Sequence, residues 1–355
     1  MTSAWHADGF RAAIQSTLDV FLAEQSRRLE PLGPDAARLA EAARASVSGG
    51  KRFRAAFCAW GFRAVRDEGP DGESLLRAAA ALEVLHASAL VHDDYMDASD
   101  TRRGRPATHT AFAALHRERS WSGVPEQYGA SAAILLGDLL LVWSDELLRL
   151  CGLPDDVVRT ALSFFDTARS EVIAGQFLDV SVQARGESDV EQAMRVLRYK
   201  SAKYSIERPL HIGAALAGGD AVMLEGLSRF GLPLGEAFQL RDDLLGVYGD
   251  PESTGKPAGD DLTEGKRTVL VALALQNASD TDARRLDDAL GRRLSVDEVA
   301  DLRRIIDESG AHAEVEERIE DLTSTSLAAL DETPVRPVAR EVLRELAAAA
   351  TQRTL

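Results

Sequence analysis

Three carboxylates, Asp93, Asp94 and Asp97, close an apolar stretch of this chain. Asp93 and Asp97 are four residues apart, so on a helix their side chains lie on one face, a turn from each other. Like charges this close repel each other, and a cation between them removes the repulsion. Carboxylate oxygens suit Mg²⁺, which takes one or two carboxylates and completes its shell with water and substrate phosphate. The spacing therefore predicts a Mg²⁺ site with Asp93, Asp94 and Asp97, the first acidic motif, as its ligands.

Two adjacent arginines, Arg102 and Arg103, follow this motif in a predicted loop. The guanidinium fork matches phosphate oxygens, so we interpret both arginines as phosphate ligands. Taken alone, an acidic stretch of this kind is more typical of a helix end that faces water.

A second acidic helix end favours the metal site. Asp242 and Asp243, the second acidic motif, close another apolar run, and the loop after them carries Lys256 and Lys266. Two acidic helix ends, each followed by cationic residues, are predicted to bind one metal–phosphate cluster from opposite sides.

A third cationic site is predicted at Gly49-Gly50-Lys51-Arg52-Phe53-Arg54. Glycines precede a helix here, and Lys51 and Arg54 lie in its first turn. Free backbone N–H groups, the positive end of the helix dipole and two cations then coincide, which favours an anion. The alternative is a helix start exposed to solvent.

These motifs, in this order and spacing, resemble the trans-isoprenyl diphosphate synthases (polyprenyl synthetases) over residues 49–268. The resemblance implies an all-α bundle around a central apolar cavity, about three Mg²⁺ ions per active site, and a homodimer. It implies head-to-tail condensation of isopentenyl diphosphate with an allylic diphosphate. The allylic carbon–oxygen bond breaks, the double bond of isopentenyl diphosphate attacks the cation, and a proton is lost to the departing diphosphate.

The resemblance also implies residue roles. Isopentenyl diphosphate is expected on Gly50, Lys51, Arg54, His86 and Arg103. The allylic diphosphate is expected on Arg102, Gln176, Lys200, Ser201, Lys256 and Lys266, and the metal on Asp93, Asp94, Asp97, Asp242 and Asp243. Lys200, Gln239 and Lys256 are the expected catalytic residues, and Phe238 is expected to stabilise the cation through its ring. Gln176 lies in a Gly175–Asp179 segment whose mid-helix glycine predicts a close approach of another element.

The sequence departs from the family pattern at two positions. Ala55 stands where the family usually has proline, and Gly246 stands where the second acidic motif usually has a third aspartate. We expect the second change to weaken the metal site without abolishing it, with Asp250 or Asp261 adding outer charge.

The resemblance also implies that the helix before Asp93 limits the length of the product. In the family, bulky aromatics four or five positions before this aspartate stop the product at fifteen carbons, and this chain has Ala89 and Ser88 there. The resemblance therefore implies geranylgeranyl diphosphate or a longer product, with Leu85 or a neighbouring helix as the floor.

The elements that must position these residues are helices. Hydrophobic residues make up 45% of the chain and aromatic residues only 6%, and alternating strand patterns are nearly absent. Apolar spacing predicts helices over 10–29, 36–47, 75–97, 130–150 and 232–248, with another beginning at Pro154. No linker divides the chain, so we expect one all-α domain over residues 1–355.

Charge and composition exclude other classes of protein. The net charge is −16, from 41 basic and 57 acidic side chains, which argues against nucleic acid and anionic membrane surfaces. Cys58 and Cys151 are far apart and predict core residues rather than a disulfide framework or a zinc site. The start of the chain lacks a signal-peptide pattern, and the best apolar run, 132–143, contains Asp138. We expect a cytoplasmic protein without a membrane span.

Two alternatives remain open. A class I terpene cyclase shares one acidic motif but does not need the cationic segment at Gly50 to Arg54. A catalytically silent subunit of a heteromeric synthase would account for Gly246. Within the synthase hypothesis, farnesyl or longer polyprenyl products are the alternatives.

Overall fold

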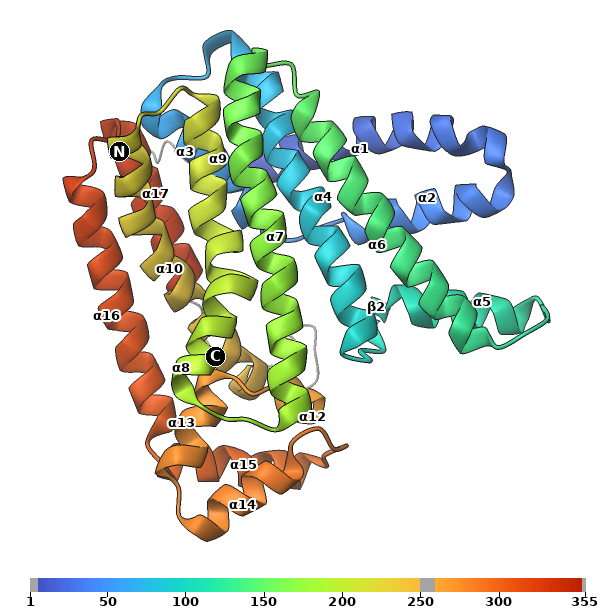
Figure 1. Ribbon diagram of the computed structural model, residues 1–355, viewed down its shortest axis with the longest axis vertical. Coiled ribbons are helices and arrows are strands. Elements are labelled where there is room, and N and C mark those ends of the chain that lie inside the picture. The colour runs from blue at the N-terminus through green and yellow to red at the C-terminus, as the bar shows by residue number, and fades with distance from the viewer. Residues whose placement is uncertain (1–5, 250–258, 353–355) are drawn as a thin grey trace.

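The computed structural model describes residues 6–249 and 259–352, and nearly all of its ordered elements are helices, which confirms the all-α prediction (Figure 1). The elements of the first half are α1 (Ala7–Leu29), η1 (Glu30–Leu32), α2 (Pro34–Ser46), α3 (Phe53–Val65), η2 (Gly69–Asp71), α4 (Gly72–Met96), β1 (Thr101–Arg102), β2 (Arg105–Pro106), α5 (Thr108–Glu118), α6 (Pro125–Arg149) and α7 (Asp155–Arg185). Those of the second half are α8 (Val190–Val196), η3 (Leu197–Glu207), α9 (Arg208–Leu216), α10 (Ala221–Tyr248), α12 (Asp260–Glu264), α13 (Val269–Asn277), α14 (Asp280–Ala289), α15 (Val296–Glu308), α16 (Ala311–Glu332) and α17 (Pro337–Thr351).

Helix α4 runs through the centre of the molecule and carries the first acidic motif at its end. Its alanine run, Ala78 to Ala81, is fully buried, because small side chains let neighbouring helices approach from several sides. The segment Gly69–Met96 is long and apolar enough to cross a membrane, which the sequence analysis overlooked. However, 67% of its most apolar window is buried inside the protein. Its apolarity is accounted for by the core.

Element η3, between α8 and α9, is a π-helix, a wide form that is rare and often found at functional sites. Two glycines make room for it. A Cβ on Gly175 of α7 would lie 2.5 Å from the backbone nitrogen of Lys200, and a Cβ on Gly235 of α10 would lie 2.5 Å from the carbonyl oxygen of Ala202. The predicted close approach at Gly175 is therefore confirmed, and η3 is held tightly between α7 and α10.

Partly buried ion pairs fix η3 and the start of α9 against α7. The carboxylate of Glu171 accepts two hydrogen bonds from Arg208, both 2.7 Å long, and lies 3.3 Å from the ammonium of Lys203. Lys203 also lies 3.5 Å from Glu207. Paired guanidinium–carboxylate contacts of this kind fix orientation as well as distance.

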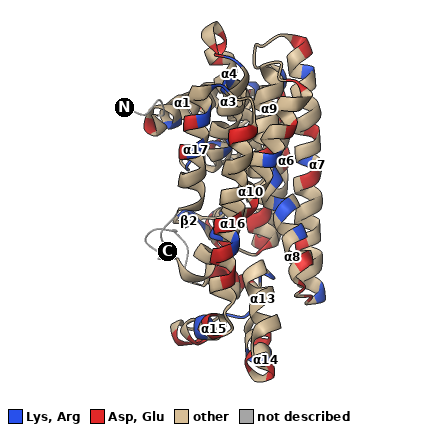
Figure 2. Cartoon of the chain, turned by 90° about the vertical axis from the view of Figure 1, so that its left-hand side faces the viewer, with Lys and Arg blue, Asp and Glu red and all other residues tan. Residues whose placement is uncertain are grey.

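The outer elements surround this centre. In Figure 1, α1 and α2 project as a hairpin on one side, and α14 and α15 form the end opposite α3 and α9. Charged residues of both signs are spread over the exposed helices, including α14 and α15 (Figure 2). Strands β1 and β2 pair antiparallel, Arg102 opposite Arg105, in the segment predicted as a loop.

The predicted helices are present with small shifts at their ends. The helix predicted over 232–248 begins earlier, at Ala221, and contains Pro233 in its interior. Cys58 and Cys151 are both buried and free, as predicted.

Candidate active site

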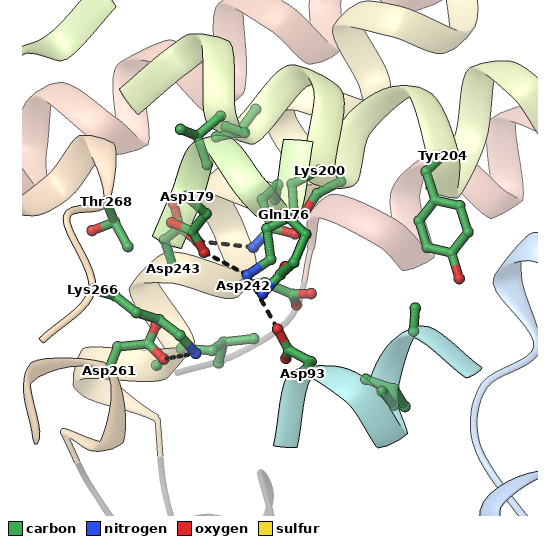
Figure 3. A pocket seen from close by; sticks show the side chains of 18 of the residues that line it. Asp93, Gln176, Asp179, Lys200, Tyr204, Asp242, Asp243, Asp261, Lys266 and Thr268 are labelled. Carbon is green, nitrogen blue, oxygen red and sulfur yellow. Dashed lines mark hydrogen bonds and ion pairs between the residues drawn. The ribbon is translucent and has the colours of Figure 1, made fainter. Parts of the chain in front are cut away.

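A cavity of about 730 Å³ lies among α3, α4, α7, η3, α10, α12 and the start of α13. It brings together residues that are far apart in the sequence (Figure 3). The residues that line it and were predicted as site residues are Lys51, Arg54, His86, Ala89, Asp93, Arg102, Gln176, Lys200, Ser201, Gln239, Asp242, Asp243 and Lys266.

Of the first acidic motif, Asp93 lines this cavity, from the last turn of α4. Oδ1 of Asp93 lies 3.3 Å from the ammonium of Lys200. Burial favours the neutral acid, but the charges of Lys200, Lys266 and Arg102 outweigh it and lower the pKa of Asp93. Asp97 behaves in the opposite way, because burial and the nearby charge of Asp93 raise its pKa to about 6. The two carboxylates therefore repel each other as expected and titrate at different pH.

Lys200 projects from η3 and joins the acidic motif to α7. Its ammonium donates to Oδ2 of Asp179 at 2.6 Å and to Oδ1 of Asp93 at 3.3 Å. Burial works against its charge, but Asp93 and Asp179 overcome that effect and raise the pKa of Lys200. Lys200 is thus a cation throughout the physiological range.

The second acidic motif faces the first across the cavity, from α10. Nε2 of Gln239 donates to Oδ1 of Asp243 at 2.9 Å. Asp243 is 7% exposed. Burial, reinforced by the charges of Asp261 and Asp242, raises the pKa of Asp243 well above its usual value, although the hydrogen bond from Gln239 opposes this. Carboxylates crowded in this way are stabilised by added positive charge.

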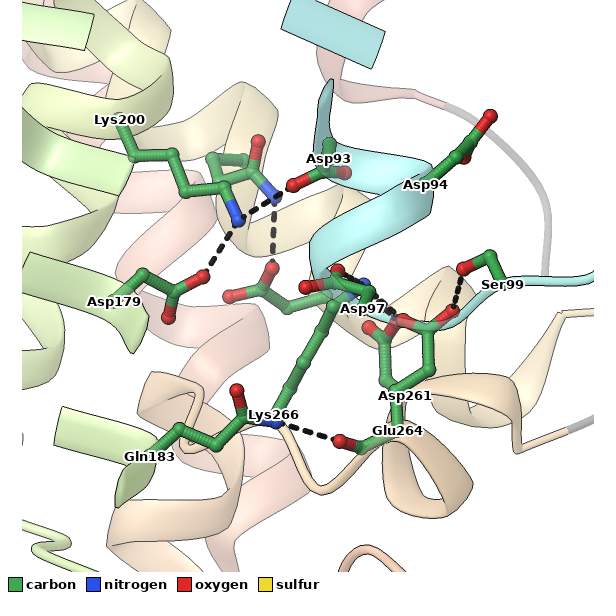
Figure 4. A network of polar contacts seen from close by, with 12 residues as sticks. Asp93, Asp94, Asp97, Ser99, Asp179, Gln183, Lys200, Asp261, Glu264 and Lys266 are labelled. Atoms are coloured by element: carbon green, nitrogen blue, oxygen red, sulfur yellow. Dashed lines mark hydrogen bonds and ion pairs between the residues drawn. The ribbon is translucent and has the colours of Figure 1, made fainter. Parts of the chain in front are cut away.

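Lys266 links the two sides of the site (Figure 4). Its ammonium lies 3.2 Å from Asp261, 2.5 Å from Glu264 and 3.8 Å from Asp97. The hydroxyl of Ser99, just after α4, donates to Glu264 at 2.8 Å. The loop after α4 and helix α12 are therefore connected through one buried lysine and one glutamate.

Asp261 takes the space next to Gly246, where the family pattern has its third aspartate. A Cβ on Gly246 would lie 1.9 Å from Oδ2 of Asp261. A carboxylate from α12 thus lies where a side chain on Gly246 would begin.

The other side of the cavity is cationic. The guanidinium of Arg54 lies over the ring of Tyr204, 4.4 Å from its centre, and donates to Ser205 at 2.8 Å. His86 forms a 3.1 Å hydrogen bond with the hydroxyl of Tyr204. Burial and the nearby arginines, Arg54 first among them, lower the pKa of His86 well below its usual value. His86 is therefore a neutral hydrogen-bonding group beside an anion site.

Arg103 lies next to this cationic side without lining the cavity. Its Nη1 donates to the carbonyl of Ser48 at 2.7 Å, and its Nη2 would lie 2.9 Å from a Cβ on Gly50. Gly50 therefore provides the space in which Arg103 packs against the loop before α3. Burial and the charges of other arginines lower the pKa of Arg103, as expected for cations crowded without an anion.

Several predicted residues lie elsewhere. Asp94 is turned away from Asp93 in Figure 4, and Nε of Arg102 donates to it at 2.7 Å, so its charge is already paired within the protein. Ser88 was expected to face the product but points at α6, where its hydroxyl donates to the carbonyl of Gly137 at 2.7 Å.

Two further placements differ from expectation. Leu85 is 2% exposed and belongs to the core rather than to the cavity lining. Phe238 is 6% exposed and packs edge-on against Phe53 at 5.9 Å, away from the described lining. Lys256 and Asp250 lie outside the described residues.

Some lining residues were not predicted as site residues. Asp179 was expected, together with Gln176, to face a diphosphate–magnesium assembly, whereas no role was predicted for Tyr204. Tyr204 follows Lys200 by four residues, a spacing that brings both to one face of a helix. The signal for Asp261 was its place in an acidic pair before Lys266.

The donor set fits Mg²⁺ bound together with phosphate. Among residues 6–249 and 259–352, no three side chains of His, Cys, Asp or Glu converge closely enough to hold a metal ion by themselves. Mg²⁺ does not require such a cage, because it uses one or two carboxylates and takes the remaining oxygens from water and phosphate. Nε2 of Gln176 and Nε of Arg54 are buried without a hydrogen-bond partner in the described part of the chain. Such donors are suited to phosphate oxygens.

Comparisons with known proteins identify relatives of this chain. The polyprenyl synthetase family matches residues 36–308. A solved geranylgeranyl pyrophosphate synthase from Corynebacterium glutamicum, complexed with isoprenyl diphosphate and magnesium, is 41% identical and covers 99% of this chain and 100% of its own, with a TM-score of 0.95. A geranylgeranyl diphosphate synthase from Mycobacterium tuberculosis is 36% identical over 68% of this chain and 63% of its own length. A geranylfarnesyl diphosphate synthase from Natronomonas pharaonis is 30% identical over 98% of each.

Proposed function

Because this chain belongs to the polyprenyl synthetase family, we propose that it condenses isopentenyl diphosphate head-to-tail with allylic diphosphates and makes geranylgeranyl diphosphate. The observation that carries the proposal is the cavity itself, with acidic motifs on two opposed helices and a separate cationic side. Two anionic substrates can then be held next to each other in different surroundings.

We propose that Asp93, Asp97 and Asp242 hold Mg²⁺, about three ions in all, with Asp261 adding charge where Gly246 leaves none. The metal neutralises the charge that develops on the leaving diphosphate. Lys200 lies between Asp93 of α4 and Asp179 of α7 and is placed to stay in contact with the same diphosphate as its bond breaks.

The remaining polar groups of this side orient the allylic substrate. The unpartnered amide of Gln176 is a donor for a phosphate oxygen, and Lys266 supplies a second buried cation. Arg102 reaches toward Asp93 while paired with Asp94, so we propose that it contacts phosphate through the edge of its guanidinium that Asp94 leaves accessible. We propose Lys256 and Ser201 as further ligands of this diphosphate.

Isopentenyl diphosphate is proposed to bind on the cationic side, to Lys51, Arg54 and His86. Arg103 adds charge from behind the Gly50 loop. A neutral His86 donates or accepts one hydrogen bond without adding a charge that would repel the neighbouring arginines. The terpene cyclase alternative needs no such second diphosphate site.

The product chain is proposed to extend past Ala89, which lines the cavity one turn below Asp93. A small side chain leaves this depth open, and this favours a product longer than fifteen carbons. On α7, Val172 lines the cavity one turn before Gln176 and is a candidate for part of its wall.

We also propose a cytoplasmic homodimer of single-domain subunits. Helix α7 exposes Ile173, Phe177 and Val180, which share one face, and Phe177 is 73% exposed. Neighbouring α6 exposes Leu135 and Val142. Apolar faces of this extent on adjacent helices are typical of subunit interfaces.

The test is an elongation assay with the purified chain, isopentenyl diphosphate and farnesyl diphosphate, with Mg²⁺ or with a chelator. We expect Mg²⁺-dependent release of diphosphate together with a longer prenyl product. Asp93→Asn and Lys200→Gln should each lower kcat by about a hundredfold. Absence of elongation at saturating Mg²⁺ would favour the silent subunit, and a released hydrocarbon would favour the cyclase.

A further inference from the structure

Arg52 lies in the middle of the cationic segment before α3, between Lys51 and Arg54, but it is not part of the cavity surface. Lys51 and Arg54 line the cavity, whereas Arg52 is absent from the described lining residues and is 5% exposed. Its backbone has a φ of 58°, a left-handed conformation that residues with a Cβ rarely adopt. Such a conformation persists only where surrounding contacts hold it.

The guanidinium of Arg52 makes those contacts with three other elements. Its Nη1 lies 3.2 Å from Oε2 of Glu83 on α4. Its Nη2 donates at 2.6 Å to Oε1 of Gln15 on α1 and at 2.6 Å to the carbonyl of Val47 at the end of α2. Both terminal nitrogens of the planar guanidinium are used here, in a geometry that a lysine cannot reproduce.

Glu83 performs a second task at the same place. Its Oε1 accepts the backbone N–H of Ala55 at 3.1 Å. Ala55 is the third residue of α3, and its N–H is one of the four that a helix start leaves without a partner. The carboxylate of Glu83 therefore caps α3 and neutralises Arg52 at once, and it is itself only 5% exposed.

We infer that the buried Arg52–Glu83 pair is a positioning device for the isopentenyl diphosphate subsite. It turns the chain at Arg52 so that Lys51, just before it, and Arg54, two residues after it, both face the cavity. Glu83 lies on α4 one turn before His86, on the helix that also carries Asp93. The pair thus sets the distance between the cations of α3 and the first acidic motif. This inference rests on the proposed function of the cavity.

A direct role of Arg52 in substrate binding does not agree with its surroundings. Its terminal nitrogens are occupied by Glu83, Gln15 and Val47, and the side chain is buried away from the described lining. Arg52 is therefore a positioning residue, although its place in the sequence motif suggests a third phosphate ligand.

The experiment compares Arg52→Gln, Glu83→Gln and the double variant with the wild type. KM is measured separately for isopentenyl diphosphate and for farnesyl diphosphate, and thermal unfolding is followed in parallel. We expect each single substitution to raise the KM for isopentenyl diphosphate by about tenfold or more, with less than about a twofold change for farnesyl diphosphate. The double variant should be no worse than the poorer single variant, because both act through one contact.

Two further variants separate positioning from charge and from stability. Arg52→Lys keeps the charge but not the fork, so we expect it to raise the same KM; an unchanged KM would overturn the inference in favour of simple electrostatics. Glu68→Gln makes the matched change at the other end of α3, where Glu68 accepts from Arg63 at 2.7 Å, and should leave both KM values unchanged.

Other outcomes also overturn the inference. These are equal increases in both KM values, additive effects of the two substitutions, or normal KM values in folded variants. If the buried pair is needed for folding, Gln15→Ala removes a single contact of Arg52 and should raise the same KM by a smaller factor. Calorimetric binding of isopentenyl diphosphate gives the same comparison without turnover. If the wild type is inactive, the proposed function is contradicted. The calorimetric binding of isopentenyl diphosphate to wild type and variants then decides the positioning role.

Discussion

A Cβ on Gly246 would lie 1.9 Å from Oδ2 of Asp261, so the chain can carry a side chain at only one of these two places. The carboxylate next to Gly246 of α10 therefore comes from α12. Because Asp261 also pairs with Lys266 at 3.2 Å, this carboxylate is held by the same lysine that lies near Asp97.

The first prediction exchanges these two positions. Gly246→Asp alone should lower kcat by about tenfold or more, since its side chain displaces Asp261. Asp261→Gly alone should weaken Mg²⁺ binding to a similar degree. The combination of both should be more active than either single variant, because space and charge are restored together. Activity and Mg²⁺ dependence of the four proteins give the coupling, and strictly additive losses would contradict the exchange.

The second prediction separates two adjacent small residues of α4. Ala89→Phe fills the cavity one turn below Asp93 and should shift the product toward fifteen carbons with little change in thermal stability. Ser88→Phe should instead destabilise the protein by about 1–3 kcal/mol, because Ser88 is 3% exposed and packed against Gly137. Product length by chromatography and unfolding by denaturant measure both effects. A shortened product from Ser88→Phe in a stable protein would contradict this assignment.

The third prediction concerns pH and follows from the pKa of Asp97. Burial and Asp93 raise this pKa to about 6, so below that pH the carboxyl holds a proton that Mg²⁺ must displace. Mg²⁺ affinity should therefore fall as pH decreases, by up to about tenfold per pH unit below the pKa. Above it, the affinity should level off.

Mg²⁺ titrations at constant ionic strength, from about pH 5 to about pH 8, test this sign. Asp97→Asn should weaken binding at neutral pH and remove the step near pH 6. An affinity that increases on acidification, or a step that survives in Asp97→Asn, would show that another group controls binding.

The fourth prediction concerns the exposed apolar face of α7. Phe177→Asp places a charge at the centre of the proposed subunit contact and should convert the dimer to a monomer at micromolar concentration. Burying one such aromatic side chain contributes about 1.5–3 kcal/mol, so its loss alone weakens association by a factor of ten or more. Light scattering with size-exclusion chromatography measures the mass. Val222→Asp, at an exposed position of α10, is the control and should leave the mass unchanged.

The sequence predicted the helices and the acidic motifs well, because both depend on local spacing. An apolar period of 3.6 residues fixes which face of a helix is buried, and carboxylates four apart must share a face. The same spacing also fixes the relative directions of the two small residues before Asp93. Ala89 and Ser88 point about 100° apart around a helix, so Ala89 can line the cavity while Ser88 packs against α6.

Other features depend on contacts that spacing does not encode. The π-helical turn at η3 requires Gly175 and Gly235 from two other helices, and neither is near it in the sequence. Arg102 pairs with Asp94, and Arg52 is buried against Glu83. In each case the sequence offers several acidic partners, and it does not show which one is used. A sequence motif does not distinguish the charged side chains that line the cavity from those that pair within the protein, because that depends on how the helices pack.

The most direct measurement of the central claim is the product distribution of the wild-type chain. The purified protein is incubated with Mg²⁺, isopentenyl diphosphate and, in separate reactions, allylic diphosphates of five, ten and fifteen carbons. A twenty-carbon diphosphate as the main product from each primer is the expected result. A product that stops at fifteen carbons would contradict the open cavity at Ala89, and no elongation of any primer would contradict the synthase itself.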